Sequence, residues 1–504
     1  MTESPSPPAG EAKLDAAVLK VAAVVVLGAI MSILDITVVS VALPTFQAEF
    51  DASYAHVAWT MTGYTLALAT VIPLTGWAAD RFGTKRLYLL ALLLFVLGSV
   101  LCSVAWDITS LITFRVLQGL GGGMLMPLGM TIMTRAAGPE RIGRVMAVLG
   151  IPMLLGPIGG PILGGWMIES LSWHWIFLIN VPIGIVAMFA AWRILAKDSP
   201  TPSESFDFVG MLLMSPGLAL FLYGVSSIPE EGTVAAAKVL VPAGVGAVLI
   251  AAFVRHAFKP EHPLIDLRLF KNKQLTTAVV TLSLFAIAVM GAMLLIPSYF
   301  LQVRGESTLQ AGILVAPQGL GAMLTMPIAG RLVDKTGPGR IVLFGLTLVL
   351  GGMAVLTQVG AQTSYVVVLG ALFLMGMGMG ASMMPTMTAA LQTLRDHMIA
   401  RGSTMMNIVQ QVATSIGTAV MSVVLTNQTT EIAQAAVAAQ RAPAIAEQLP
   451  PGVVEQGLDE LASGFGTTFT VAAVLLLLAF VPALFFPRRV RAGESDTVEV
   501  MPMH

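Results

Sequence analysis

Fourteen runs of mostly apolar residues, each about 18 to 28 residues long, constrain this chain more than any other feature. A helix of about 20 apolar residues crosses the ~30 Å hydrocarbon core of a bilayer. Backbone polar groups in lipid must pair within the segment, so the runs are predicted to be helices. The sequence therefore predicts an all-α polytopic membrane protein with 14 transmembrane helices. The runs lie at about 17–42, 56–78, 87–105, 108–134, 143–168, 174–196, 207–227, 236–258, 275–301, 310–333, 341–358, 364–391, 403–425 and 467–487.

The charge content supports this prediction and excludes most functions of soluble proteins. Only 11% of the residues are charged, against about 25% in a soluble domain, and the mean hydropathy is +0.84. The net charge of −1 indicates no nucleic-acid partner. The chain has one cysteine, six scattered histidines and no phosphate-binding loop of the Gly-x4-Gly-Lys-Ser/Thr type. We therefore expect no metal, no cofactor and no enzymatic activity, and an ion gradient as the energy source.

Basic residues predict the orientation of the helices. With both chain termini in the cytoplasm, nearly all of the 27 Lys and Arg residues fall on the inner side. This asymmetry is the positive-inside pattern of membrane proteins. The exceptions are Lys238, Arg304 and Arg441 on the outer side and Arg115 within a run.

The two ends of the chain are polar. Residues 1–14 and 488–504 are predicted to be disordered cytoplasmic tails. No cleavable signal peptide is predicted, because the first apolar run is long enough to stay in the bilayer. The one long segment on the outer side, about 426–464, is rich in Ala, Gln and Glu, and we expect a short interfacial or soluble helix there.

A short segment after the second run recurs after the tenth. Residues 76–86 (GWAADRFGTKR) and 330–340 (GRLVDKTGPGR) share Gly, Asp, a cation, Gly and a final Arg at an offset of 254. The glycine-rich stretch 119–127 is similarly echoed at 376–385. Such repeats are typical of transporters built from two halves around a central cavity. We predict a six-helix half at 15–200, two inserted helices and a cytoplasmic loop at 201–270, and a second six-helix half at 271–487.

Five motifs make the chain resemble a known family. They are LDITVVSVALP at 34–44, GWAADRFGTKR at 76–86, RVLQGLG at 115–121, GPIGGPILGG at 156–165 and WHWIFLINVP at 173–182. Together they resemble the 14-helix drug:proton antiporters of the major facilitator superfamily, of the EmrB/QacA type, over about residues 15–490. Ser40 stands where that branch usually has Asn, and His174 where it usually has Arg.

The resemblance implies a major facilitator fold and proton-coupled export of lipophilic or cationic drugs by alternating access. It also implies a monomer in the plasma or inner membrane of a bacterium. The expected partners are membrane lipids, protons and a small-molecule drug or lipid substrate. Two alternatives stay open: an exporter of an endogenous lipid or metabolite, and a membrane receptor or scaffold that transports nothing.

Asp35 and Arg115 are charged residues that lie well inside apolar runs. A charge at the bilayer centre costs about 2.5–3.5 kcal/mol on the insertion scale, so each side chain should face a partner or a cavity. We expect Asp35 to exchange a proton and to attract a cationic substrate. Arg115 does not deprotonate, and we expect it to tune that carboxyl or to bind backbone carbonyls. The alternatives are a structural ion pair and an arginine that extends to the interface.

The other candidate residues form three groups. A latch for the outward-open state, or simple membrane anchoring, is predicted for Asp80, Arg81, Lys85, Arg86, Asp334 and Arg340. Small residues at four-residue spacing permit close helix approach, and a seal between the halves, or plain packing, is predicted for Gly156, Gly160, Pro161, Gly164 and Gly165. The candidate cavity-lining residues, with bonding between helices as the alternative for the last three, are Gln118, Asn180, Asn407, Gln410 and Gln411.

Overall fold

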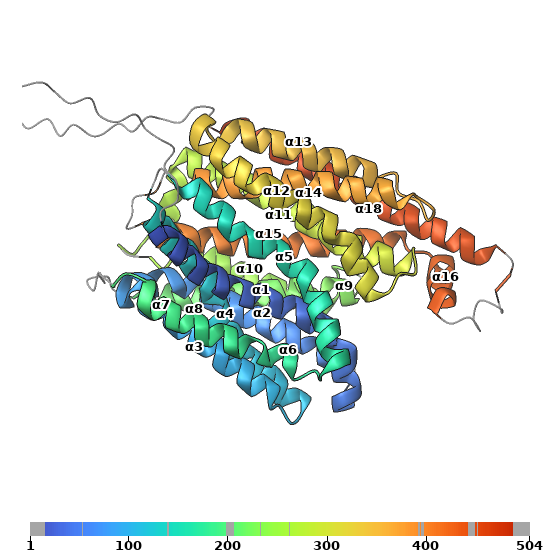
Figure 1. Ribbon diagram of the computed structural model, residues 1–504, viewed down its shortest axis with the longest axis horizontal. Helices are drawn as coiled ribbons and strands as arrows, with labels where there is room; N and C mark the ends of the chain where they lie inside the picture. The colour runs from blue at the N-terminus through green and yellow to red at the C-terminus, as the bar shows by residue number, and fades with distance from the viewer. Residues whose placement is uncertain are drawn as a thin grey trace, which may run out of the picture.

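Helices make up the regular structure of the described part of this protein, a computed structural model (Figure 1). The tails predicted at 1–14 and 488–504 lie outside the described residues. The described residues are 16–52, 54–138, 141–197, 206–231, 233–261, 263–391, 394, 398–441, 449–450 and 452–486.

The helices follow the order of the apolar runs. The first set is α1 (Ala16–Phe50), α2 (Tyr54–Phe82), α3 (Thr84–Ser103), α4 (Ile108–Ala137), α5 (Ile142–Ser170), α6 (Trp175–Leu178) and α7 (Asn180–Ile194). The middle set is α8 (Phe208–Ser226), α9 (Ile228–Glu231), α10 (Ala237–His256) and the 3-10 helix η2 (Leu267–Lys271). The last set is α11 (Lys273–Gln302), α12 (Thr308–Thr336), α13 (Pro338–Leu356), α14 (Tyr365–Leu391), α15 (Ile399–Gln428), α16 (Glu431–Arg441) and α18 (Val453–Ala483).

The all-α membrane prediction is confirmed. Within the described residues, 12 helices are long and apolar enough to cross a membrane, α6 and α7 counting together as one. The other two predicted runs, 56–78 and 143–168, lie in α2 and α5, which are each 29 residues long. The structure therefore fits the predicted plan of 14 helices, and the exact number of membrane crossings stays a prediction.

The segment predicted as a long outside loop, about 426–464, is mostly helical where it is described. α15 continues to Gln428, α16 follows, and α18 begins at Val453, well before the apolar run at 467. Gln and Glu are good helix formers in water, so a helix need not end where its apolar stretch ends. α16 is the short helix that the composition predicted, and it packs on α18.

The same helix pairs pack together in the first and last sets. α1 packs on α5 and α7, α2 packs on α4, and α3 packs on α4 and α7. In the same way α11 packs on α15 and α18, α12 packs on α14, and α13 packs on α14 and α18. The two sets meet where α2 contacts α15 and where α5 contacts α12. Because α2 corresponds to α12 and α5 corresponds to α15, these two contacts are equivalent to each other. The internal sequence repeat is thus matched by a repeat in packing.

The repeated loop motif contains a glycine with the same backbone conformation in both copies. Gly83 joins α2 to α3 with φ 96° and ψ 143°, and Gly337 joins α12 to α13 with φ 82° and ψ 158°. This region of backbone space is open essentially to glycine alone. The sharp junction between consecutive helices therefore explains why glycine stands at this position of the repeat.

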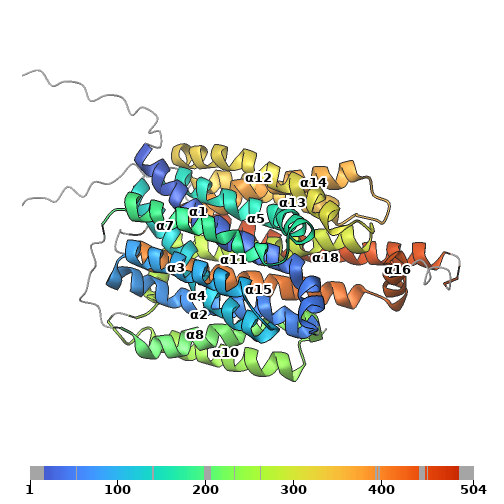
Figure 2. The same cartoon turned by 60° about the horizontal axis from the view of Figure 1, so that its bottom comes forward.

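α8 and α10 form a closely packed pair at the edge of the bundle (Figure 2). A Cβ atom on Gly224 would lie 2.6 Å from the backbone nitrogen of Ala243, so the two helices are in near backbone contact there. α8 also packs on α2 and α15, one from each of the two sets. At one end of the pair, His256 Nε2 lies 2.7 Å from Asp207 Oδ1.

Candidate functional site

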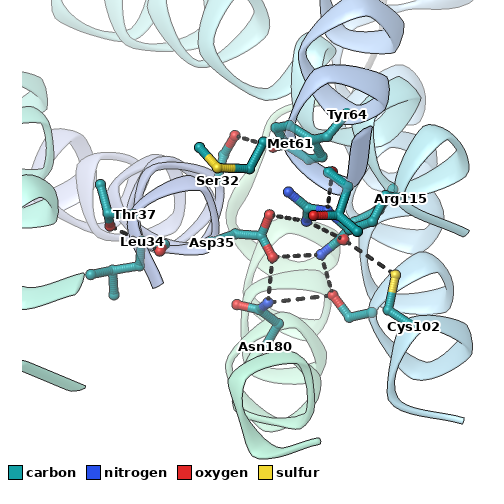
Figure 3. Close-up of polar contacts among 12 residues, drawn as sticks. Ser32, Leu34, Asp35, Thr37, Met61, Tyr64, Cys102, Arg115 and Asn180 are labelled. Atoms are coloured by element: carbon teal, nitrogen blue, oxygen red, sulfur yellow. Dashed lines mark hydrogen bonds and ion pairs between the residues drawn. The ribbon is translucent and has the colours of Figure 1, made fainter. Parts of the chain in front are cut away.

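Asp35 and Arg115 form a fully buried ion pair. Arg115 Nη1 lies 2.5 Å from Asp35 Oδ2, and both side chains are 0% exposed (Figure 3). The glycine-rich stretch that follows Arg115 on α4 permits this burial, because a Cβ on Gly121 would lie 2.5 Å from the backbone nitrogen of Phe95 on α3. α4 can therefore pack directly on α3 and on α1, which carries Asp35.

Two amide side chains complete the surroundings of Asp35. Gln118 Nε2 donates to Asp35 Oδ1 at 2.8 Å and to Ser99 Oγ at 2.8 Å. Gln118 Oε1 accepts from Arg115 Nη1 at 2.7 Å. Asn180 Nδ2, on α7, lies 3.4 Å from both Asp35 Oδ1 and Ser99 Oγ. The carboxyl of Asp35 is thus held by donors from α4 and α7.

Arg115 is also fixed by α2. Its Nε donates to the carbonyl of Thr60 at 3.1 Å, and its guanidinium carbon lies 4.2 Å from the centre of the Tyr64 ring. The Tyr64 hydroxyl in turn lies 3.1 Å from Ser32 Oγ. Arg115 therefore binds a backbone carbonyl, as one of the two predicted roles requires, and it does not extend to the membrane interface.

Gln118 and Asn180 lie beside Asp35. Both are candidates for lining a cavity, which stays a prediction; in this structure they are buried, at 0% and 2% exposure, and bind the Asp35 carboxyl. Gln118 is three residues after Arg115 and so shares its helix face, a spacing that could have placed it here. Ser99 and Tyr64 were not predicted, because a single neutral residue in an apolar run carries no signal of its partner.

The glycines of α5 lie against α1 beside Asp35. Side chains built on Gly156 and Gly160 would meet Ile33 and Thr37, respectively, and one on Gly164 would lie 3.1 Å from a methyl carbon of Val38. Thr37 Oγ1 also donates to the carbonyl of Gly156 at 3.1 Å.

Gly165 and Pro161 complete this group. Gly165 has open space where a side chain would stand, with no other atom within 4 Å. The side chain of Pro161 lies outside the described residues. Small residues therefore permit the close approach of α5 to α1 through Gly156, Gly160 and Gly164.

We expect Gly160→Ala to destabilise the protein and Gly165→Ala to leave it unchanged or slightly more stable. The new methyl at 160 would overlap Thr37, and overpacking of this kind costs about 1–3 kcal/mol. At 165 the methyl meets nothing, and Ala is a better helix former than Gly by up to about 1 kcal/mol. Thermal unfolding of both purified variants in the same detergent measures the difference. Equal unfolding temperatures would contradict the close α1–α5 contact.

The loop motif links both sets of helices. Asp80, at the end of α2, pairs with Arg135 of α4 at 3.6 Å and with Arg401 of α15 at 3.8 Å. Lys85 Nζ donates to the carbonyls of Trp192 and Leu195, at the end of α7, at 2.6 and 2.8 Å. Arg135 and Arg401 were not predicted as partners, because they lie far from the motif in sequence.

The remaining latch candidates differ in exposure and in whether their side chains are described. Arg81, Arg86 and Arg340 are exposed, and the side chain of Asp334 lies outside the described residues. Asp80 and Lys85 are thus two residues of the motif that contact other helices in the part of the chain that the structure describes.

The polar residues of α15 divide between helix contacts and partial exposure. Asn407 Nδ2 donates to the carbonyl of Ser403 at 2.8 Å and lies 3.3 Å from the Met130 sulfur on α4. Ser403 Oγ lies 2.9 Å from Thr131 Oγ1, also on α4. Gln410 and Gln411 are half-buried. Asn407 thus takes part in a contact between α4 and α15, as one of its two predicted roles requires.

A cavity of about 620 Å³ lies far along the chain from these residues. Arg304, Tyr365, Glu455 and Asp459 are among the residues that line it. The guanidinium of Arg304 donates to the carbonyl of Ala361 at 2.5 Å and lies over the Tyr365 ring at 4.3 Å. Among the described residues, no group of three or more His, Cys, Asp or Glu side chains is placed to hold a metal ion.

Comparison with known proteins gives the family. Residues 25–418 match the family model of the Major Facilitator Superfamily. The chain belongs to the major facilitator superfamily. It is 50% identical over 493 residues to a Mycobacterium tuberculosis protein named "Multidrug resistance protein B homolog", covering 95% of this chain and 91% of that protein. It is 32% identical over 395 residues to the "Multidrug export protein EmrB" of Haemophilus influenzae, covering 78% and 77%.

A solved transporter structure has the same fold. The human organic anion transporter MFSD10 (TETRAN) superposes with a TM-score of 0.62 at 16% identity, over 91% of this chain and 99% of that one. The resemblance to the major facilitator superfamily found in the sequence motifs is thus confirmed. The chain is a multi-pass membrane protein of this transporter family.

Proposed function

We propose that this major facilitator protein exports lipophilic or cationic drugs in exchange for protons, by alternating access. The observation that carries the proposal is the carboxyl of Asp35, which is fully buried in the middle of a membrane helix beside Arg115. Intramembrane ionisable residues usually serve transport. The names of the relatives from Mycobacterium tuberculosis and Haemophilus influenzae support drugs as the substrate class.

Proton and drug would compete for the same negative charge. A proton neutralises Asp35 directly, and a cationic drug beside it would favour the ionised form. Occupancy by one therefore disfavours the other, which is the requirement for exchange. Arg115 keeps its charge throughout, and its bonds to Thr60 and Gln118 hold it in place while Asp35 changes state.

The arrangement of halves supports alternating access. We propose that 15–200 and 271–487 are the two halves, with 201–270 inserted between them and both termini in the cytoplasm. The equivalent pairing of helices in the two sets supports this division, and the α2–α15 and α5–α12 contacts form the surface on which the halves would rock. We further propose that the protein acts as a monomer in a bacterial inner membrane and catalyses no reaction on its substrate.

Asp80 would serve as the latch between the halves on the cytoplasmic side. Its carboxyl pairs with Arg135 in its own half and with Arg401 in the other. Nearby, Ser403 and Thr131 bring α15 and α4 into hydrogen-bonding contact. Opening toward the cytoplasm requires both contacts to separate, so the ion pairs of Asp80 favour the outward-open state.

We expect Asp80→Asn to increase the labelling rate of a cysteine placed at position 403 by about fivefold. Removing the charge weakens the pairing with Arg401, and a loss of about 1 kcal/mol corresponds to that factor. The reporter Ser403→Cys is introduced together with Cys102→Ser and labelled from the cytoplasmic side with an impermeant maleimide. Glu261→Gln, an exposed acid outside the motif, is the matched control. Equal labelling rates in the Asp80 variant and its parent would count against the latch.

Ethidium transport in everted membrane vesicles tests the proposed function. We expect vesicles that contain the protein to accumulate ethidium when a proton gradient is imposed, and a protonophore to abolish the accumulation. A receptor or scaffold would give no proton-dependent transport. An exporter of an endogenous lipid would change the lipid composition of a deletion strain and leave its susceptibility to ethidium unaltered. Either result would overturn drug export as the function.

A further inference from the structure

All the described hydrogen-bond partners of Asp35 are donors in the arrangement seen here. They are Nη1 of Arg115, Nε2 of Gln118 and Nδ2 of Asn180. This set suits an ionised carboxylate, which only accepts hydrogen bonds. A protonated carboxyl carries an O–H group that needs an acceptor, so proton uptake requires one of the neighbours to change from donor to acceptor.

Arg115 and Gln118 are poorly suited to that change. A guanidinium has donors only. The amide of Gln118 is held at both ends, because Oε1 accepts from Arg115 at 2.7 Å and Nε2 donates to Ser99 at 2.8 Å. Turning this amide over would place its N–H group against the N–H group of Arg115.

Asn180 is held loosely and can turn over without such a conflict. Both of its contacts in this site, to Asp35 and to Ser99, run through Nδ2 and are 3.4 Å long. If the amide turned over, Oδ1 would take the place of Nδ2 and could accept from the carboxyl of Asp35 and from the hydroxyl of Ser99. Both groups have a hydrogen to donate when Asp35 is protonated.

We propose that Asn180 is a positioning residue whose amide turns over when Asp35 takes up a proton, so that Oδ1 accepts the carboxyl hydrogen. The inference rests on the proposed exchange of a proton at Asp35. Asn180 is the first residue of α7 and follows Ile179, whose backbone is helical with φ −58° and ψ −30°, within the span Trp175–Ile194. The protonation state of Asp35 on α1 is thereby passed to a side chain of the neighbouring membrane segment.

Few other charged or titratable groups face Asp35 from the helices around it. Arg115 of α4, Tyr64 of α2 and Cys102 of α3 are close enough to interact electrostatically with it. On α7 the described charge is Arg193, in the last turn, about 20 Å along the helix from Asn180. On α5 it is Glu169, more than a turn beyond the glycine that contacts Val38. These groups are the same in all the variants below.

The test is the pH dependence of proton release when ethidium binds to the purified full-length protein in weakly buffered detergent solution. Asn180→Leu removes the acceptor for the protonated carboxyl together with the long, 3.4 Å donor contact to the ionised one. The proposal requires the loss of the acceptor to dominate, so the midpoint of the release profile should move to lower pH by about one unit, a tenfold loss of proton affinity. A shift to higher pH would overturn the inference. Asn180→Asp places a second carboxyl beside Asp35, and two such groups share a proton. Its midpoint should move to higher pH by about one unit or more.

Controls separate this role from a purely structural one. Thr468→Val removes a buried hydroxyl of α18 that bonds within its own helix, and it should leave the midpoint unchanged. If Asn180→Leu does not fold, Asn180→Ala, which removes the same acceptor with less bulk, takes its place, because the shift of Asn180→Asp is expected from its added charge alone. Midpoints equal to that of the parent in the folded Asn180 variants, even with lowered thermal stability, would overturn the inference while leaving the proposed function intact. A parent protein that releases no protons at any pH would overturn both.

Discussion

Asp35→Asn should abolish the accumulation of ethidium that a proton gradient drives. One pH unit supplies about 1.4 kcal/mol, or tenfold accumulation, for each proton exchanged. An asparagine cannot exchange a proton. The ratio of ethidium inside the vesicles to ethidium outside, about ten for one exchanged proton at a gradient of one pH unit, should therefore fall to about one. The variant loses the counter-charge of Arg115 and should be less stable than the parent. Its amide has nearly the shape of the carboxyl and can still accept from Arg115, which keeps its bonds to Thr60 and Gln118, so we expect the variant to reach the membrane.

The measurement is ethidium uptake into everted vesicles at a fixed pH gradient, with expression checked for each variant. Asp51→Asn is the matched control, because it makes the same substitution just beyond α1, at an exposed residue with φ 46° that asparagine also tolerates. This control should keep the accumulation of the parent. Full proton-driven accumulation by the Asp35 variant would remove the carboxyl from the coupling mechanism.

Arg115→Leu is expected to lower the free energy of unfolding by about 3–5 kcal/mol, the usual cost of leaving a buried charge without its partner. Asp35 has no exposure to water through which its charge could be solvated. Adding Asp35→Asn to this variant removes the orphaned charge, so the double variant should recover part of the loss. It should regain no transport, since the titratable group is gone.

Thermal unfolding of the four proteins in one detergent gives the coupling between the two residues. Arg255→Leu, which removes an exposed arginine from the last turn of α10, should cost less than about 1 kcal/mol. Additive effects of the Asp35 and Arg115 substitutions would show that the pair contributes nothing beyond its two members.

The tertiary structure extends the sequence prediction most at Asp35. Charges within apolar runs identified Asp35 and Arg115, because the membrane makes each isolated charge costly. Their contact spans 80 positions, and the bond from Asn180 to Asp35 spans 145. Such partners depend on which helix faces meet, and an apolar run has no strong periodicity to indicate its buried face. Ser99 and the Thr60 carbonyl were therefore found only in the structure.

At the loop motif, too, the sequence pattern identified the residues and the tertiary structure identified their partners. The repeat at an offset of 254 identified Asp80 and the glycine at 83, and the positive φ of Gly83 explains the glycine by local backbone conformation alone. The partner of Asp80 in the last set of helices, Arg401, lies 321 positions away. Nothing near Arg401 repeats the motif, so only the packing of α15 on α2 brings the two together.

Amino-acid sequence alone determined the all-helical membrane architecture, the family and the two charges at its centre, because the hydrocarbon core imposes length, apolarity and the cost of charge on each segment separately. The folded arrangement decided which donors surround Asp35, how closely α5 approaches α1 and where Asp80 joins α2 to α15. Those features depend on distances between helices, and these are set by the shapes of many packed side chains together.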